Sequence, residues 1–144
     1  MASFVTEGFS EELAKLERMN LFDDAAAEEM LFAAGDVVVD EIQRAMQQAP
    51  HRIAHLASKV RYKRKVKKGK DGCPYVAVSA SGRNESGDLN ATVLFVLNYG
   101  RSPKYGQITG SYFWTKALEN AAPKVSEKVQ EIANKILRER GVSD

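Results

Sequence analysis

Few residues in this chain of 144 have side chains that could hold a metal or catalyse a reaction. His51 and His55 are four residues apart, so on a helix they would share one face and could both contact a metal ion. A zinc site needs three or four ligands, however, and these are the only two histidines, while Cys73 falls in a predicted strand. We therefore expect two solvent-facing histidines and no metal site.

The remaining candidates for catalysis have simpler structural explanations. Cys73 would need a neighbouring base to act as a nucleophile, and a small residue at the start of a strand is the simpler interpretation. The carboxylate pairs Asp23–Asp24 and Glu28–Glu29 fall where a helix begins, and negative charge there complements the helix dipole. No GxxxxGK[ST] phosphate-binding loop occurs in the sequence. We expect no catalytic residues, no cofactor and no enzyme activity.

Length and composition indicate one domain, spanning residues 1–144. The content of 44% hydrophobic and 28% charged residues is close to that of an average globular protein. The single cysteine cannot form an internal disulfide, and neither a signal peptide nor an apolar run of about 18 residues is evident. We expect a soluble protein in a reducing cytoplasm, and the net charge of +2 does not by itself require a nucleic-acid partner.

The elements that must position any site begin with a helical front, residues 9–49. Ser10 can cap a first short helix, and Asp23 or Asp24 can cap a second helix that runs to about Gln48. The apolar residues of this second helix recur at spacings of three and four. They are Ala27, Leu31, Ala34, Val38, Ile42 and Ala45.

The middle of the chain, residues 57–98, is predicted to be rich in strands. Residues 59–67 alternate between apolar and basic side chains, and residues 73–80 form the return strand after a glycine-containing turn. The apolar run 91–97 predicts a third strand that is buried on both faces.

A loop, residues 99–110, leads to a C-terminal helix predicted over residues 111–140. Pro123 lies inside this helix and is predicted to kink or split it. The fold class is therefore α+β, with a small antiparallel sheet of three to four strands packed against a long helix of the N-terminal half and a long C-terminal helix. The C-terminal helix has its apolar stripe at Phe113, Ala117, Ala121, Val125, Val129, Ile132 and Ile136.

One face of the first predicted strand is basic. Eight Lys or Arg residues fall within residues 59–70, more than an edge strand needs to discourage aggregation. DNA phosphate or an acidic protein surface would offset their repulsion. We favour a protein partner, because the net charge is low and Tyr62 is the only aromatic residue in the stretch. The alternating basic residues are Lys59, Arg61, Lys63, Lys65 and Lys67.

A second candidate surface surrounds the loop. Most of its residues are tyrosine, tryptophan or arginine, which are the types enriched at interface anchors. Interface contacts and ordinary core packing are both open interpretations for this group. Phe113 begins the apolar stripe and is expected in the core, whereas Trp114 lies off the stripe beside the loop and is a candidate anchor for a partner. The candidate interface residues are Tyr99, Arg101, Lys104, Tyr105, Tyr112 and Trp114.

These residues resemble a family of small bacteriophage proteins that join the head to the tail, also described as neck, minor tail or tail-completion proteins. In that family a strand ends in an aromatic–Gly pair, and a loop leads to a C-terminal helix that opens with aromatic residues. The matching segments here are 95-FVLNYGRS-102 and 112-YFWTKA-117, and the specific likeness covers about residues 93–122. Many members carry an acidic residue before the aromatic–Gly pair, where this chain has Asn98.

The resemblance implies a structural virion component of a tailed phage or prophage. It implies a ring of identical subunits in the virion, and it leaves open whether the free subunit is a monomer. The implied partners are head-closure and tail-terminator or tail-tube proteins. It also implies assembly in the host bacterial cytoplasm, a final place in the neck or tail, and no membrane contact. In a ring of identical subunits, one patch of each subunit contacts a different patch of the next. The basic face and the acidic residues of the helical front are candidates for these two patches. The basic face could instead line a channel beside DNA, and a small nucleic-acid-binding protein that uses residues 59–70 is the alternative function.

Overall fold

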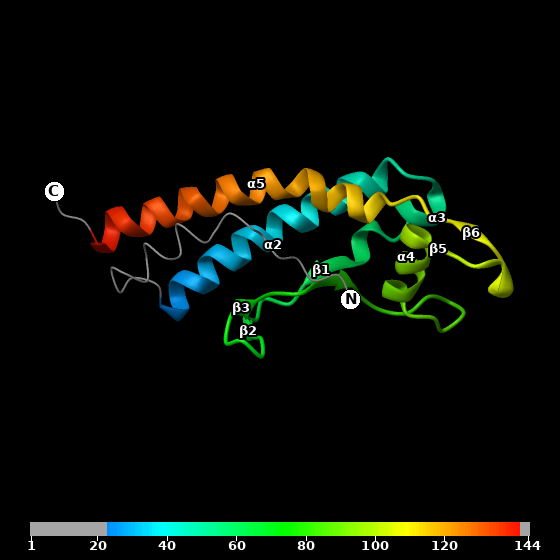
Figure 1. Cartoon of the computed structure of the whole chain (residues 1–144), viewed down its shortest axis with the longest axis horizontal. Coiled ribbons are helices and arrows are strands. Elements are labelled where there is room, and N and C mark those ends of the chain that lie inside the picture. The colour runs from blue at the N-terminus through cyan, green and yellow to red at the C-terminus, as the bar shows by residue number, and fades with distance from the viewer. Residues whose placement is uncertain (1–22, 142–144) are drawn as a thin grey trace.

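The structure is a computed structural model, and it describes residues 23–141. Its frame consists of two long helices, α2 (Asp24–Gln47) and α5 (Phe113–Ile136), which pack side by side along the length of the molecule (Figure 1). Each helix has 24 residues and is therefore about 36 Å long. The predicted short helix that begins near Ser10 lies outside the described residues.

The remaining elements are short and lie between these two helices in the sequence. The helical segments are α3 (His51–Ala54), the 3-10 turns η1 (Ala57–Lys59) and η2 (Pro103–Tyr105), α4 (Asn90–Tyr99) and the π-helical end η3 (Leu137–Gly141). The strands are β1 (Val60–Tyr62), β2 (Lys67–Lys68), β3 (Pro74–Tyr75), β4 (Val78–Ala80), β5 (Gly100–Arg101) and β6 (Ile108–Thr109).

The start of α2 is fixed by Asp23. Its carboxylate accepts a hydrogen bond from the Ala26 amide at 2.8 Å and lies 3.1 Å from an Arg140 guanidinium nitrogen. These contacts, first the Ala26 amide and then Arg140, lower the pKa of Asp23. Asp23 therefore acts as the predicted N-cap and ties the start of α2 to the end of the C-terminal helical segment.

The apolar stripes of both long helices meet in the core, as their spacing predicts. In α2 the predicted residues Ala34, Val38 and Ile42 are fully buried, whereas Leu31 and Ala45 are half-buried. All seven predicted stripe residues of α5 are buried. Pro123 does not split α5, because the helix continues through it to Ile136. Proline removes only one backbone hydrogen bond, and packing of the neighbouring stripe residues against α2 holds the helix together.

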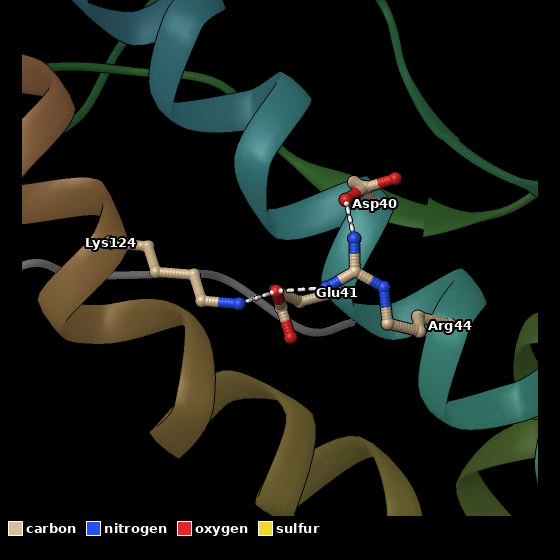
Figure 2. A network of polar contacts seen from close by, with 4 residues as sticks. All are labelled: Asp40, Glu41, Arg44 and Lys124. Atoms are coloured by element: carbon tan, nitrogen blue, oxygen red, sulfur yellow. Dashed lines mark hydrogen bonds and ion pairs between the residues drawn. The ribbon is translucent and has the colours of Figure 1, made fainter.

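A charged network joins the two long helices next to Pro123. Glu41 of α2 is only 8% exposed, and its carboxylate pairs with Lys124 of α5 and, at 3.1 Å, with Arg44 (Figure 2). Arg44 also pairs with Asp40 at 2.8 Å. A carboxylate this buried requires such partners, because an unpaired buried charge is strongly destabilising. The network therefore helps to fix how α2 and α5 lie against each other.

The predicted sheet of three to four strands is not found in the described residues. Instead there are three antiparallel pairs: β1 with β4, β2 with β3, and β5 with β6. The first two pairs form successive parts of one long hairpin, residues 60–80, which we call the basic hairpin. β1 and β4 pack against α2, whereas β2 and β3 project away from the two long helices (Figure 1).

The third predicted strand, residues 91–97, is wrong, because this segment lies within helix α4. A short apolar run fits a buried strand and a buried helical segment equally well, so periodicity could not separate them. In α4, Leu94 and Leu97 face the core, while Phe95 is 57% exposed.

Tyr62 attaches the basic hairpin to α2 over a glycine. A Cβ atom added to Gly35 would lie 2.8 Å from Cε1 of the Tyr62 ring, so the ring occupies the space that a side chain would need. The Tyr62 hydroxyl lies 2.9 Å from the Phe32 carbonyl oxygen and 2.7 Å from Asp36 Oδ1. Burial, followed by the contact with Asp36, raises the pKa of Tyr62 to about 12.

In the part of the chain that the structure describes, no helix combines the length and apolar character that crossing a membrane requires.

Candidate functional site

The side chain of Asn98 links the two ends of the loop region by hydrogen bonds. Asn98 lies in the last turn of α4 and is 2% exposed. Its side-chain Oδ1 accepts hydrogen bonds from the backbone amides of Trp114 at 2.9 Å and Thr115 at 3.3 Å. Its Nδ2 donates to Thr115 Oγ1 at 3.0 Å. Tyr112 occupies the N-cap position of α5 but supplies no side-chain hydrogen bond, and its backbone is left-handed at φ 55°. Asn98 therefore caps α5 from another helix, and we call these contacts the Asn98 clamp.

At the Asn98 clamp, two glycines allow the backbone segments that enter and leave the loop to pass in close contact, an arrangement we call the glycine crossing. Gly100 has φ +89°, and a Cβ there would lie 2.6 Å from the Ile108 carbonyl oxygen. A Cβ on Gly110 would lie 2.6 Å from the Asn98 carbonyl oxygen. No other residue fits these positions without moving the backbone. The β5–β6 hairpin (residues 100–109) is therefore held at its base by backbone contacts, with Gly100 opposite Thr109 and Arg101 opposite Ile108.

This hairpin lies at the end of the molecule opposite the start of α2 (Figure 1). Of the predicted interface residues, Tyr105 is 66% exposed, Tyr99 53% and Tyr112 47%. Arg101 is exposed and its Nε donates to the Gly106 carbonyl oxygen at 2.8 Å, while Lys104 Nζ lies 5.6 Å from the centre of the Tyr105 ring. The structure thus places five of the six predicted residues at the surface around one loop.

Trp114 is the exception and corrects a prediction. It is 8% exposed and belongs to the hydrophobic core together with Phe113, whose burial was predicted. Trp114 lies off the α5 stripe, but α4 packs against the start of α5 and covers it. Because residues 91–97 were predicted to form a strand, packing of a helix over Trp114 was not expected.

Trp114 also forms part of the wall of a pocket of about 260 Å³. The pocket is bounded by β4, α4 and the first turn of α5. Sequence reasoning missed this site, because it depends on α4 being helical. Residues that contribute to its walls include Ser79, Ala80, Ala91, Phe95, Tyr99 and Trp114.

The predicted basic face is exposed, but its strand is interrupted. Lys59 belongs to the 3-10 turn η1, and residues 63–66, between β1 and β2, are not in a strand. The Arg64 guanidinium lies 3.4 Å from Asp36 Oδ1 and 5.4 Å from the centre of the Phe32 ring.

The basic hairpin divides into anchored and unpaired cations. Arg61 Nε donates to Ser81 Oγ at 2.9 Å, and Arg64 is held by α2. Five exposed lysines have no ion-pair partner within residues 23–141: Lys63, Lys65, Lys67, Lys68 and Lys70.

The residues first considered for catalysis lie in separate places. The rings of His51 and His55 stack with their centres 5.1 Å apart, and His55 Nδ1 lies 2.7 Å from the His51 carbonyl oxygen. Cys73 is exposed near the end of the basic hairpin. Glu29 pairs with Lys135 at 2.8 Å, so this part of the acidic front is neutralised within the chain. Among the described residues, no three His, Cys, Asp or Glu side chains are grouped so that they could hold a metal ion.

Comparisons of the chain with protein-family models, with curated proteins and with solved structures each find no match.

Proposed function

We propose that this protein is a structural component of a tailed phage or prophage that acts in head–tail joining or tail completion. It does so by forming a ring of identical subunits and by docking to other proteins of the neck, such as head-closure and tail-terminator or tail-tube proteins. The observation that carries the proposal is the β5–β6 hairpin, whose base is fixed by the Asn98 clamp and whose exposed side chains are aromatic and basic.

The construction of this hairpin suits a docking element. Binding requires that mobile groups become ordered, and a segment already fixed at its base loses less entropy on association. The Asn98 clamp and the glycine crossing provide that preorganisation, while Tyr99, Tyr105 and Tyr112 provide anchors of a type common at interface hot spots.

Asn98 also bears on the resemblance. The family often has an acidic residue at this position, and a carboxylate can accept the same two hydrogen bonds from the start of α5. An acidic residue at this position would therefore cap α5 in the same way as Asn98.

Deletion of the gene tests the proposal. We expect DNA packaging and tail assembly to proceed and joining to fail, so electron microscopy of the lysate should show separate full heads and complete tails. Complementation with the wild-type gene should restore joined particles. Normal infectious particles in the deletion lysate would contradict the proposal.

A second candidate function, nucleic-acid binding, is favoured by the unpaired lysines of the basic hairpin. If these lysines contact phosphate, each contact removed lowers the slope of log affinity against log salt by about 0.9. A gel-shift titration against duplex DNA at two salt concentrations tests this function. Tight binding with a steep salt dependence supports it, and weak binding near physiological salt favours an acidic protein partner.

A further inference from the structure

The pocket beside the Asn98 clamp has a core tryptophan in its wall. Trp114 is 8% exposed and lines the pocket, so part of its side chain faces the recess. An apolar ring that entered the pocket would remove this remaining surface from water.

The mouth of the pocket is aromatic and exposed. Phe95 and Tyr99 both line the pocket, are 57% and 53% exposed, and have ring centres 4.8 Å apart. Tyr112 packs edge-on against Tyr99 at 6.1 Å. Apolar rings around a recess with a buried tryptophan are typical of an interface hot spot.

The same chain carries a side chain that suits this pocket. Tyr105 is 66% exposed and sits in η2 at the far end of the β5–β6 hairpin. Its ring would fill apolar space beside the Trp114 side chain. A cavity of about 150 Å³ already admits a benzene ring, so a pocket of about 260 Å³ can admit a phenol.

The charges beside the two surfaces are opposite. Arg101 and Lys104 flank the tip of the hairpin, and no acidic residue occurs between Tyr99 and Leu118. The loop 81–89, which joins two walls of the pocket, exposes Glu85 and Asp88. Its one basic residue, Arg83, donates to the Gly87 carbonyl oxygen at 2.7 Å.

We infer that Tyr105 of one subunit inserts into the Trp114 pocket of a second copy of this chain. The choice of a second copy rests on the proposed function, because a ring needs two different complementary patches on each subunit. The hairpin and the pocket are such a pair, so the contact is heterologous and can repeat around a ring.

A complementation experiment with two variants tests this contact. Tyr105→Ala removes the inserted side chain, and Ala91→Phe fills the pocket. We expect each variant to be monomeric by sedimentation velocity and an equimolar mixture to form a dimer, because each supplies the half that the other lacks. Tyr75→Ala, which removes another exposed tyrosine on β3, should associate like the wild type. Thermal melts establish that each variant is folded. If Ala91→Phe is not, Thr92→Trp replaces it, since Thr92 also lines the pocket.

The single tryptophan gives a direct readout of the pocket. In ¹⁵N-labelled Tyr105→Ala, the indole N–H signal of Trp114 should shift on addition of unlabelled Ala91→Phe and should not shift on addition of the double variant. Tyr105→Phe keeps the ring that fills the pocket and should associate to within about 3-fold of the wild type. Tyr105→Ala should weaken association at least about 30-fold.

A wild-type chain that stays monomeric at about 1 mM would overturn the inference, since millimolar contacts are populated there. Association that Tyr105→Ala leaves unchanged would overturn it as well. If association fails while gene deletion still blocks joining, the contact is wrong and the proposed function stands. If association occurs but the deletion lysate contains complete particles, the contact stands and the proposed function is wrong.

Discussion

Tyr62 packs against Gly35, and this contact requires that residue 35 has no side chain. The Tyr62 ring lies where a Cβ of Gly35 would be, and its hydroxyl is held by Phe32 and Asp36. The ring therefore cannot swing away without losing hydrogen bonds. This explains why a glycine is tolerated inside a long helix, where it costs about 1 kcal/mol relative to alanine.

Gly35→Ala should accordingly destabilise the wild-type protein by about 1–3 kcal/mol through overpacking. In a Tyr62→Ala background the space is vacant, and Gly35→Ala should stabilise by about 1 kcal/mol through helix propensity. Urea unfolding of the four proteins measures both effects. Stabilisation by Gly35→Ala in the wild type would contradict the packing.

Tyr62 should also make stability depend on alkaline pH. Its pKa is raised from 10.0 to about 12, so between these values the folded state keeps the phenolic proton while the unfolded state loses it. The free energy of unfolding should therefore be unaffected by this group below pH 10 and fall as the pH rises from 10 to 12. Tyr62→Phe cannot ionise and should lack this component of the decline. Parallel stability curves for the two proteins over that range would exclude the effect.

At the scale of elements, the Asn98 clamp joins α4 to α5. Asn98→Ala leaves two amides at the start of α5 without an acceptor and should lower the free energy of unfolding by about 2–3 kcal/mol. Asn98→Asp should retain most of the stability at pH 7 and lose it as the carboxylate is protonated. Urea denaturation at pH 7 and pH 4 separates these outcomes. Equal losses for both substitutions at pH 7 would rule out the capping role.

Urea unfolding also measures how much the packing of Trp114 beneath α4 contributes to stability. Trp114→Ala should cost about 3–5 kcal/mol, as expected for a core aromatic residue. Tyr105→Ala, at an exposed position, should change stability by no more than about 0.5 kcal/mol. A small effect of Trp114→Ala on urea unfolding would restore the earlier interpretation of Trp114 as a surface anchor.

The elements also show what the sequence could and could not predict. The helices α2 and α5 were predictable, because long amphipathic stretches carry a strong periodic signal. Helix α4 was not, since its few apolar residues also fit a strand. The exposed tyrosines were identified from residue type alone. The Asn98 clamp and the pocket were missed, because they depend on contacts between residues 16 or more positions apart, such as Asn98 with Trp114.

At the scale of the whole molecule, two projections extend from a stiff pair of helices. The basic hairpin and the β5–β6 hairpin leave the body at different places along its length (Figure 1). The Glu41 network and the paired apolar stripes hold α2 and α5 together (Figure 2). The two hairpins are therefore kept at a fixed separation and can contact different partners.

Charge reversal tests whether the basic hairpin is one of these contacts. Lys65→Glu combined with Lys67→Glu should leave the free energy of unfolding within about 0.5 kcal/mol, since both side chains are exposed, and should prevent head–tail joining. Lys116→Glu with Lys128→Glu makes the same charge change on α5 and should permit joining. Infectious-particle yields from complemented deletion lysates measure the difference. Equal yields from the two double variants would exclude the basic hairpin from joining.

The glycine crossing at the base of the β5–β6 hairpin has a consequence for how such a protein can diversify. Gly100 and Gly110 fix the path of the backbone into and out of the hairpin, independently of the residues at its end. Substitutions, and even insertions, in the segment 102–107 should therefore leave the positions of α4 and α5 unchanged. Variants can then differ in this segment while the scaffold is inherited intact, so whatever the segment contacts can change without any rearrangement of the helices.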